Sequence, residues 1–413
     1  MSTQSSDRSR FLVLLTSAVV LAKAVPSLRN PGLFAEDGSV LATKYLSGAG
    51  CEGWFEYYNG YSAVLPNVVA HAICALARPT WIPAAFVVCA VAIAVASRLA
   101  LIRFVADVSG RRAVVAFAVL AMAYPIDNHA LLCSLMYSQW SMLLILYVWA
   151  LEMVLGRARG WWSFVAPVLI WSSPLSCVVL PLAIHALFAR SRPREVRIFA
   201  GVLVAAAVSY VVFGVETGRG IALGRGVATT AMEWFSWRVV GDVLLGPSLR
   251  AWWYETSQVS VVLVSVTAAS GAIAAMCLMA RSALSRTRVP LLLASGVLAL
   301  GVHAVVVVGR PEVLAPGGLW GNRHAFVQCM VLILWTAAWL GVRWSRSGRL
   351  HKVVLSILVF AHATAVVGSN RFFWTPSKHE ARRVAEFMSR VESGAGTYKL
   401  ERGDGDIAIV RED

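Results

Sequence analysis

The stretch NPGLFAEDGSV, residues Asn30 to Val40, follows directly on the first long apolar run of the chain. It contains two adjacent carboxylates, Glu36 and Asp37. An acid at the centre of a membrane-spanning helix costs about 2.5–3.5 kcal/mol, so a loop at the membrane surface is the expected place for such a pair. The fold therefore depends on how the apolar runs before and after this loop cross a bilayer.

The composition indicates a membrane protein. Of the 413 residues, 58% are hydrophobic and only 14% are charged, whereas a soluble domain carries about 25% charged residues. A net charge of +15 would suggest a nucleic-acid partner in a soluble protein. Here the basic residues lie in short loops between apolar runs, which is typical of cytoplasmic loops. We therefore expect a bilayer around the chain and no nucleic acid.

The apolar runs predict an all-α polytopic protein with about 11 transmembrane helices. The first run is interpreted as a retained signal anchor, because no convincing cleavage site follows it. The predicted spans are 11–28, 81–104, 113–128, 135–155, 161–171, 175–188, 198–215, 259–280, 289–309, 323–343 and 353–368.

The segment 61–77 decides the topology. It is short for a span and contains Pro66, Asn67 and His71. If it lies flat at the interface, the basic loops all fall on one side, which predicts a cytoplasmic N-terminus and an external C-terminus. The alternative, that it spans the membrane, would export the basic stretch 98–112. The first reading places the loops 29–80 and 216–258 on the outer face of a transmembrane domain, 1–368.

Two further segments have distinct patterns. The short runs 161–171 and 175–188 are interrupted at Pro174, so the backbone groups freed there need partners inside the protein. The tail, 369–413, is not membrane sequence and predicts a small α+β appendage. Its stretch SKHE at 377–380 is a capping box, followed by an apolar helical face and two short strands around Gly403–Gly405. The face consists of Val384, Phe387, Met388 and Val391.

Asp37 is the first candidate for chemistry. It precedes GSVLATKYLSG, which suits a short amphipathic helix ended by Gly48. One interpretation makes Asp37 the N-cap of that helix. The other makes it a base held next to the bilayer, with Glu36 shifting its pKa. Both roles are compatible, because a cap also fixes the carboxylate in place.

Further candidates lie at the same predicted face. Asp127, Asn128 and His129 end an apolar run, and Gln139 opens the next helix. Acids at a membrane edge are functional candidates, although a plain interfacial loop end explains them equally. Arg323, followed by His324, opens a late apolar run; it either extends to lipid headgroups or binds an anion with its planar guanidinium.

Several chemistries are not supported. The sequence has no nucleotide-binding loop, and its histidines show no metal-ligand spacing. A soluble nucleotide-sugar donor or ATP drive is therefore unsupported, and a lipid-linked substrate or an ion gradient is expected instead.

Five stretches, taken in order, form an arrangement known from other proteins. They are AEDGSVLATKYLSGAG, YYNGYSAVLPNVVAHAI, AMAYPIDNHALL, VLIWSSPLSCVVLPLAIH and GLWGNRHAF. This arrangement resembles the GT-C glycosyltransferases, polytopic enzymes that take sugars from polyprenyl-phosphate carriers on the outer face. It is most similar to the bacterial branch related to O-antigen-modifying glucosyltransferases and lipid A aminoarabinose transferase.

The resemblance implies transfer of a sugar from a polyprenyl-phosphate donor to a hydroxyl of an envelope glycan or lipid, outside the bacterial inner membrane and with inversion. In this family a loop carboxylate is the catalytic base, which implies Asp37. Because the pair reads Glu-Asp-Gly where many members have Asp-Glu or Asp-Asp, the base can shift to Glu36.

The resemblance also implies that substrates contact Tyr61 and the candidates at 127–129, 139 and 323–324. No cofactor follows with certainty, and a divalent cation is left open. The alternatives are a transporter or flippase for a lipid-linked saccharide or an ion-coupled solute, with Asp37 and Asp127 lining the path, and a non-catalytic assembly protein.

Overall fold

The fold is known from a computed structural model. The residues it describes are 3–34, 36–58, 60–109, 129–158, 160–215, 234–241, 291, 294–302, 327–333, 348–349, 352–353, 356, 378–394, 396–401 and 406–411. The protein is mostly helical, with a small C-terminal strand pair.

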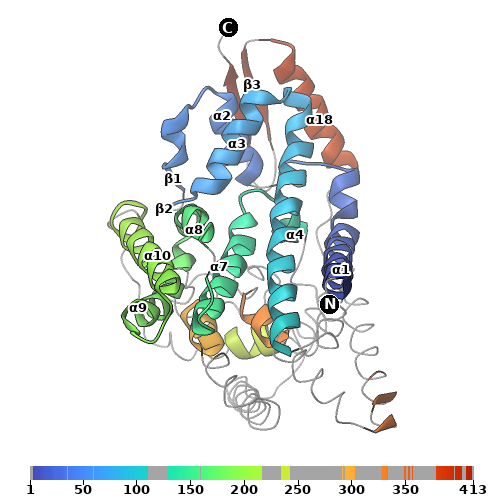
Figure 1. Ribbon diagram of the computed structural model, residues 1–413. Coiled ribbons are helices and arrows are strands. Elements are labelled where there is room, and N and C mark those ends of the chain that lie inside the picture. The colour runs from blue at the N-terminus through green and yellow to red at the C-terminus, as the bar shows by residue number, and fades with distance from the viewer. Residues whose placement is uncertain are drawn as a thin grey trace, which may run out of the picture.

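Long helices form the body of the molecule (Figure 1). Helices α1 (Thr3–Arg29), α4 (Ile82–Ser109) and α7 (Ser138–Val154) pack side by side, and α10 (Arg194–Phe213) lies in a second group beyond α7. In the described part of the chain, two helical segments are long and apolar enough to cross a membrane: Pro79–Val108 and Arg194–Phe213. The outward side of α10 exposes Val211 and Phe213, as a lipid-facing surface would.

The prediction of about 11 spans is tested only in part. The runs 11–28, 81–104, 135–155 and 198–215 are helical, and so are the described residues 294–302 and 327–333. The runs 113–128 and 259–280, and nearly all of 353–368, lie outside the described residues. The full number of spans remains a prediction.

The two short runs form separate helices. Helix α8 (Trp162–Ile170) is followed by η4 (Pro174–Val179) and α9 (Leu180–Phe188), and all three pack against α10. The break between them is satisfied inside the protein, as predicted. The Ser172 hydroxyl donates to the Val168 carbonyl at 2.6 Å and accepts from the Leu65 amide at 3.1 Å. The Trp171 carbonyl accepts from the Val64 amide.

The loop after α1 folds into a compact layer at one end of the helices (Figure 1). Its elements are η1 (Asp37–Ala42), α2 (Thr43–Leu46), η2 (Cys51–Trp54), β1 (Tyr57–Tyr58), β2 (Tyr61–Ser62), α3 (Val64–Leu76) and η3 (Pro79–Trp81). The predicted helix stop is confirmed, because Gly48 has φ +92° directly after α2, a conformation that favours glycine. Helix α3 has 13 residues and is about 20 Å long, too short for a hydrocarbon core of about 30 Å.

The tail forms the predicted appendage. Helix α18 (Lys378–Glu392) buries the predicted apolar face, and β3 (Gly396–Leu400) pairs antiparallel with β4 (Ile407–Arg411). The capping residue Ser377 lies outside the described residues.

The tail docks on the loop that carries the acidic pair. Strand β4 packs on η1 and α2, and the Val410 amide donates to the Ser47 hydroxyl at 3.0 Å. Helix α18 packs on η3, where the Thr80 amide donates to Glu392 at 3.4 Å. The loop and the tail therefore lie at the same end of the molecule, and their side of the membrane stays a prediction.

This docking depends on a glycine. A Cβ at Gly38 would lie 2.6 Å from Ile407 Cδ1 and 3.2 Å from Leu33 Cβ. We expect Gly38→Val to destabilise the protein by about 1–3 kcal/mol, because it overpacks this junction. Adding Ile407→Ala should then restore part of the loss. Thermal unfolding of the detergent-purified protein measures both effects.

Gly160→Val is the matched control, because a Cβ at Gly160 meets no atom within 4 Å. An equal effect of Gly38→Val and Gly160→Val, or no recovery with Ile407→Ala, would contradict the docking described above.

Candidate functional site

The Asp37 carboxylate joins the acidic loop to the helical body. It is 1% exposed and accepts three hydrogen bonds from the junction between α6 (His129–Cys133) and α7. The Ser134 hydroxyl donates to Oδ1 at 3.0 Å, the Met136 amide donates to Oδ1 at 2.8 Å, and the Leu135 amide donates to Oδ2 at 3.0 Å. Both oxygens are thus occupied by fixed donors.

Burial shifts the titration of this group. Loss of water around Asp37 raises its pKa from the ordinary 3.8 to about 7, the three hydrogen bonds oppose that rise, and the neighbouring Glu36 charge adds slightly to it. Desolvation outweighs the donors because a buried carboxylate loses the hydration of its charged form.

Asp37 is not the N-cap of its own helix. It is the first residue of η1, the preceding position is Glu36, and no side chain caps this end. The capping interpretation is therefore wrong. The carboxylate accepts from amides at the start of a different helix, and not from amides of its own helix. Sequence spacing could not reveal this, because Ser134 is 97 residues away.

Glu36 has a different environment. Its Oε1 accepts from the Tyr58 hydroxyl at 3.2 Å. Its Oε2 is buried and has no hydrogen-bond partner among the residues that the structure describes. A buried oxygen without a partner is rare in native structures and requires an explanation. Of the two adjacent carboxylates, Glu36 is therefore the one with an oxygen available to a further donor.

The hairpin β1–β2 holds two tyrosines beside this pair. Tyr58 and Tyr61 are cross-strand neighbours whose rings meet edge to face at 6.5 Å. Gln139, in the first turn of α7, donates from Nε2 to the Tyr61 hydroxyl at 3.2 Å. Tyr61 and Gln139, both predicted from the sequence, thus contact one another near the acidic pair.

The hairpin is anchored to the end of α10. The Tyr57 hydroxyl donates to the Phe213 carbonyl at 2.7 Å, and the Ser62 amide donates to the Gly214 carbonyl at 2.9 Å. These bonds hold the tyrosine side chains in place against the body. Sequence reasoning missed Tyr58, although the Asn-Gly pair before Tyr61 is a typical hairpin signal.

Other predicted residues are not placed. Asp127, Asn128, Arg323 and His324 lie outside the described residues, and for His129 only the backbone, in α6, is described. Within the described ranges no group of three or more His, Cys, Asp or Glu residues could hold a metal ion. The divalent cation left open by the resemblance has no ligand set in that part of the chain.

Arg98 has an environment that the sequence reading did not predict. The stretch 98–112 was counted among the basic loops, although the predicted span 81–104 overlaps it, and α4 continues to Ser109. Arg98 is buried between α4 and α7, where its Nη1 donates to the hydroxyls of Ser97 at 2.8 Å and Ser141 at 2.7 Å. Buried cations in helices of this apolar kind mark functional sites by default.

Comparison with known proteins identifies no family for this chain. No protein-family model matches the chain, and no similar curated protein or solved structure is found.

The buried carboxylate gives a stability prediction. In Asp37→Asn, one oxygen becomes an NH2 group that faces an N–H or O–H donor, so we expect a loss of about 1–3 kcal/mol. The loss should be larger near pH 5 than near pH 8. With a pKa near 7, the native carboxyl keeps its proton at pH 5 while the unfolded chain has released it, so wild-type stability falls as pH rises from about 4 to about 7.

Thermal unfolding at both pH values tests this prediction. Asp107→Asn is the matched control, because the Asp107 side chain is 61% exposed. The prediction fails if Asp37→Asn is as stable as the control, or if its pH dependence equals that of the wild type.

Proposed function

We propose that this protein is a polytopic membrane glycosyltransferase of the GT-C type. It would transfer a sugar from a polyprenyl-phosphate carrier to a hydroxyl of an envelope glycan or lipid on the outer face of the bacterial inner membrane. The observation that carries this proposal is the pair of adjacent carboxylates in unlike environments. One is fixed by three donors, and the other keeps an oxygen that has no partner in the described part of the chain.

The two acids take different roles in this proposal. Glu36 accepts the proton of the acceptor hydroxyl through Oε2, while Tyr58 holds its other oxygen. The acceptor oxygen then forms a bond to the anomeric carbon as the bond to phosphate breaks, and the polyprenyl phosphate leaves with the electron pair. A single displacement of this kind inverts the anomeric carbon. Asp37 is a positioning residue, because its oxygens already accept from the α6–α7 junction.

The surroundings support such a reaction. The two tyrosine rings and Gln139 offer stacking and hydrogen-bonding groups beside Glu36, which suit a sugar. In this proposal the carboxylate lies near the membrane surface. A lipid-linked donor can therefore react there while its lipid chain stays in the bilayer. Stabilisation of the leaving phosphate is assigned to Arg323 by the resemblance alone.

A transporter for a lipid-linked saccharide or an ion-coupled solute is the second candidate. It is favoured by Arg98, since a transport path needs polar groups within the membrane depth and this cation is buried between two long apolar helices. The clustering of carboxylates, tyrosines and Gln139 at one end of the body favours the enzyme.

Glu36→Gln is the variant that tests the enzyme. We expect transfer to fall at least about a hundredfold, because the amide cannot accept a proton, with unchanged thermal unfolding. In cells whose only copy carries this variant, mass spectrometry should detect accumulated polyprenyl-phosphate sugar. Glu52→Gln is the control, because Glu52 is exposed in η2 of the same loop. Normal lipid-linked sugar levels in Glu36→Gln cells would remove Glu36 as the base.

Membrane sidedness has its own test. The native Cys51 is exposed in the loop, so a membrane-impermeant maleimide should label it in intact cells. In a Cys51→Ser background, Arg382→Cys in the tail should also be labelled, and Arg192→Cys should react only after permeabilisation. Labelling of Arg192→Cys in intact cells, or protection of the other two positions, would overturn the proposed topology.

A further inference from the structure

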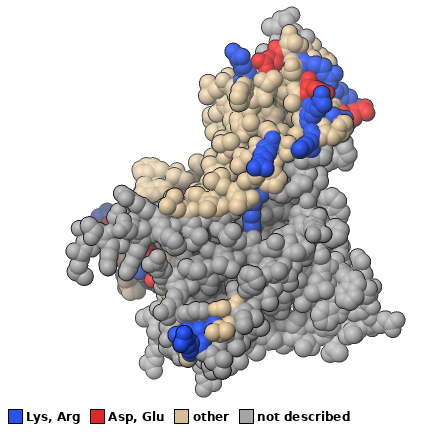
Figure 2. All heavy atoms as spheres, turned by 90° about the vertical axis from the view of Figure 1, so that its right-hand side faces the viewer, with Lys and Arg blue, Asp and Glu red and all other residues tan. Residues whose placement is uncertain are grey.

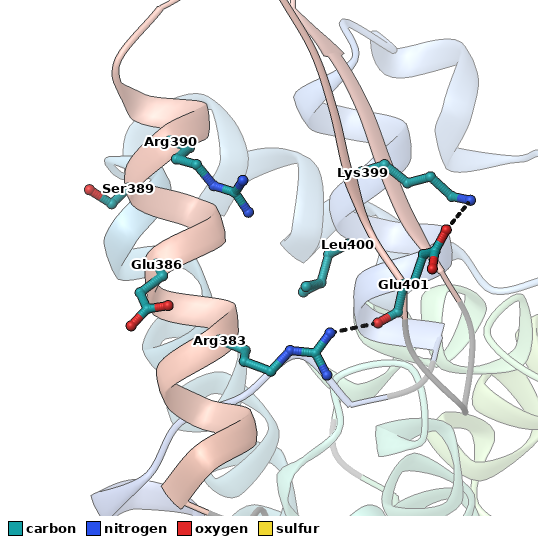
Figure 3. A pocket seen from close by; sticks show the side chains of 7 residues that line it. All are labelled: Arg383, Glu386, Ser389, Arg390, Lys399, Leu400 and Glu401. Atoms are coloured by element: carbon teal, nitrogen blue, oxygen red, sulfur yellow. Dashed lines mark hydrogen bonds and ion pairs between the residues drawn. The ribbon is translucent and has the colours of Figure 1, made fainter.

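A charged groove lies between α18 and the strand pair of the tail (Figure 3). Its volume is about 800 Å³. Leu400 lies between the helix and the strands, and the other lining side chains are polar or charged. The groove is far from Glu36 in sequence, and the proposed transfer reaction does not use it.

The acids that line this groove are already paired. Glu386 accepts from Arg382 Nε at 3.1 Å on the surface of α18. Glu401 forms an ion pair with Lys399 at 3.0 Å, and Lys399 also contacts Asp406 at 3.4 Å. Figure 3 shows that Glu386 points away from the strands. These pairs cancel most of the negative charge near the groove.

Two guanidinium groups in the groove have no carboxylate partner among the described residues. Arg383 donates from Nη2 to the backbone carbonyl of Glu401 at 3.0 Å. Arg390 forms no side-chain hydrogen bond or ion pair with the described part of the chain. Both extend from α18 toward the strands (Figure 3). Guanidinium forks bind carboxylates and phosphates in two parallel hydrogen bonds, so this groove is a site for anionic groups.

The spacing of the two cations limits the ligand. Arg383 and Arg390 are seven positions apart on one helix, which separates their backbones by about 10 Å. At this separation each guanidinium group can bind a separate anionic group of one ligand. A chain with repeated anionic groups can reach them, because successive charges along it are separated by sugar rings.

The surroundings favour a glycan over a lipid. Among the described residues that line the groove, Leu400 is the one apolar side chain, so these residues form no apolar rim for acyl chains. The exposed apolar side chains of α9 and α10, such as Phe188 and Phe213, lie on the helical body. Figure 2 shows the charged side chains of the tail gathered at the end of the molecule away from most of the body.

We propose that the groove between α18 and β3 binds an extended anionic glycan through Arg383 and Arg390. The assignment of this glycan as the acceptor rests on the proposed transferase function, since the tail docks on the loop that carries Glu36. The binding itself needs no donor, so it is measured separately from transfer.

The experiment measures equilibrium binding of fluorescent oligogalacturonate to the full-length protein in detergent at low salt. We expect saturable binding that weakens as salt is added. Arg390→Gln should weaken it about tenfold, the loss expected for one charged hydrogen-bonding group. Arg383→Gln, Arg390→Gln together should weaken it further. A neutral maltooligosaccharide of the same length should not compete.

Two controls make the result specific. Lys378→Gln removes the same charge from an exposed position of α18 that does not line the groove, and it should change binding less than about twofold. The binding assay contains no sugar donor, so a failed transfer assay does not affect this test. Equal unfolding temperatures show that the arginine variants keep their fold.

Three outcomes would overturn the proposal. They are absence of oligogalacturonate binding, equal weakening by Lys378→Gln and Arg390→Gln, and equal competition by phosphatidylglycerol vesicles. The last outcome would assign the groove to anionic lipid headgroups.

Discussion

The interaction on which this structure depends is the burial of one carboxylate against three donors of another segment. Asp37 links the first loop to the start of α7, so it fixes the position of η1 relative to the helical body. Glu36 precedes it, and its carboxylate accepts from the Tyr58 hydroxyl. Gly38 follows it and packs against Ile407 of the tail. Of these three consecutive residues, Asp37 contacts the helical body, Glu36 is the candidate base, and Gly38 contacts the appendage.

The two adjacent carboxylates of this loop have different surroundings. Asp37 has fixed donors but no water, which raises its pKa toward 7. Glu36 has one phenolic donor and one oxygen that no described residue contacts by a hydrogen bond. The loop therefore separates the task of holding the backbone from the task of accepting a proton.

Local patterns predicted local structure well. The apolar face of α18, the two tail strands and the break near Pro174 follow from periodicity and turn residues whose interactions are close in sequence. The contacts of Asp37 and Arg98 did not follow, since their partners come from α6–α7 and α7. The burial of Arg98 was not predicted, because a buried cation in an apolar helix has no periodic signature. The relation of Glu36 to Asp37 needed the positions of Ser134 and Tyr58.

The docking of the tail has a consequence for how the chain is made. Ser47 and Val410 are 363 residues apart. Because translation proceeds at about 5–20 residues per second, the tail that packs on the first loop is synthesised roughly 20–70 s after it. During that interval Gly38 and the edge of α2 face solvent. A chain truncated just before the tail would keep its long helices, but no tail would pack on the turn that carries Glu36 and Asp37. Assembly of this loop is thus a late event in biosynthesis, although its residues are among the first to leave the ribosome.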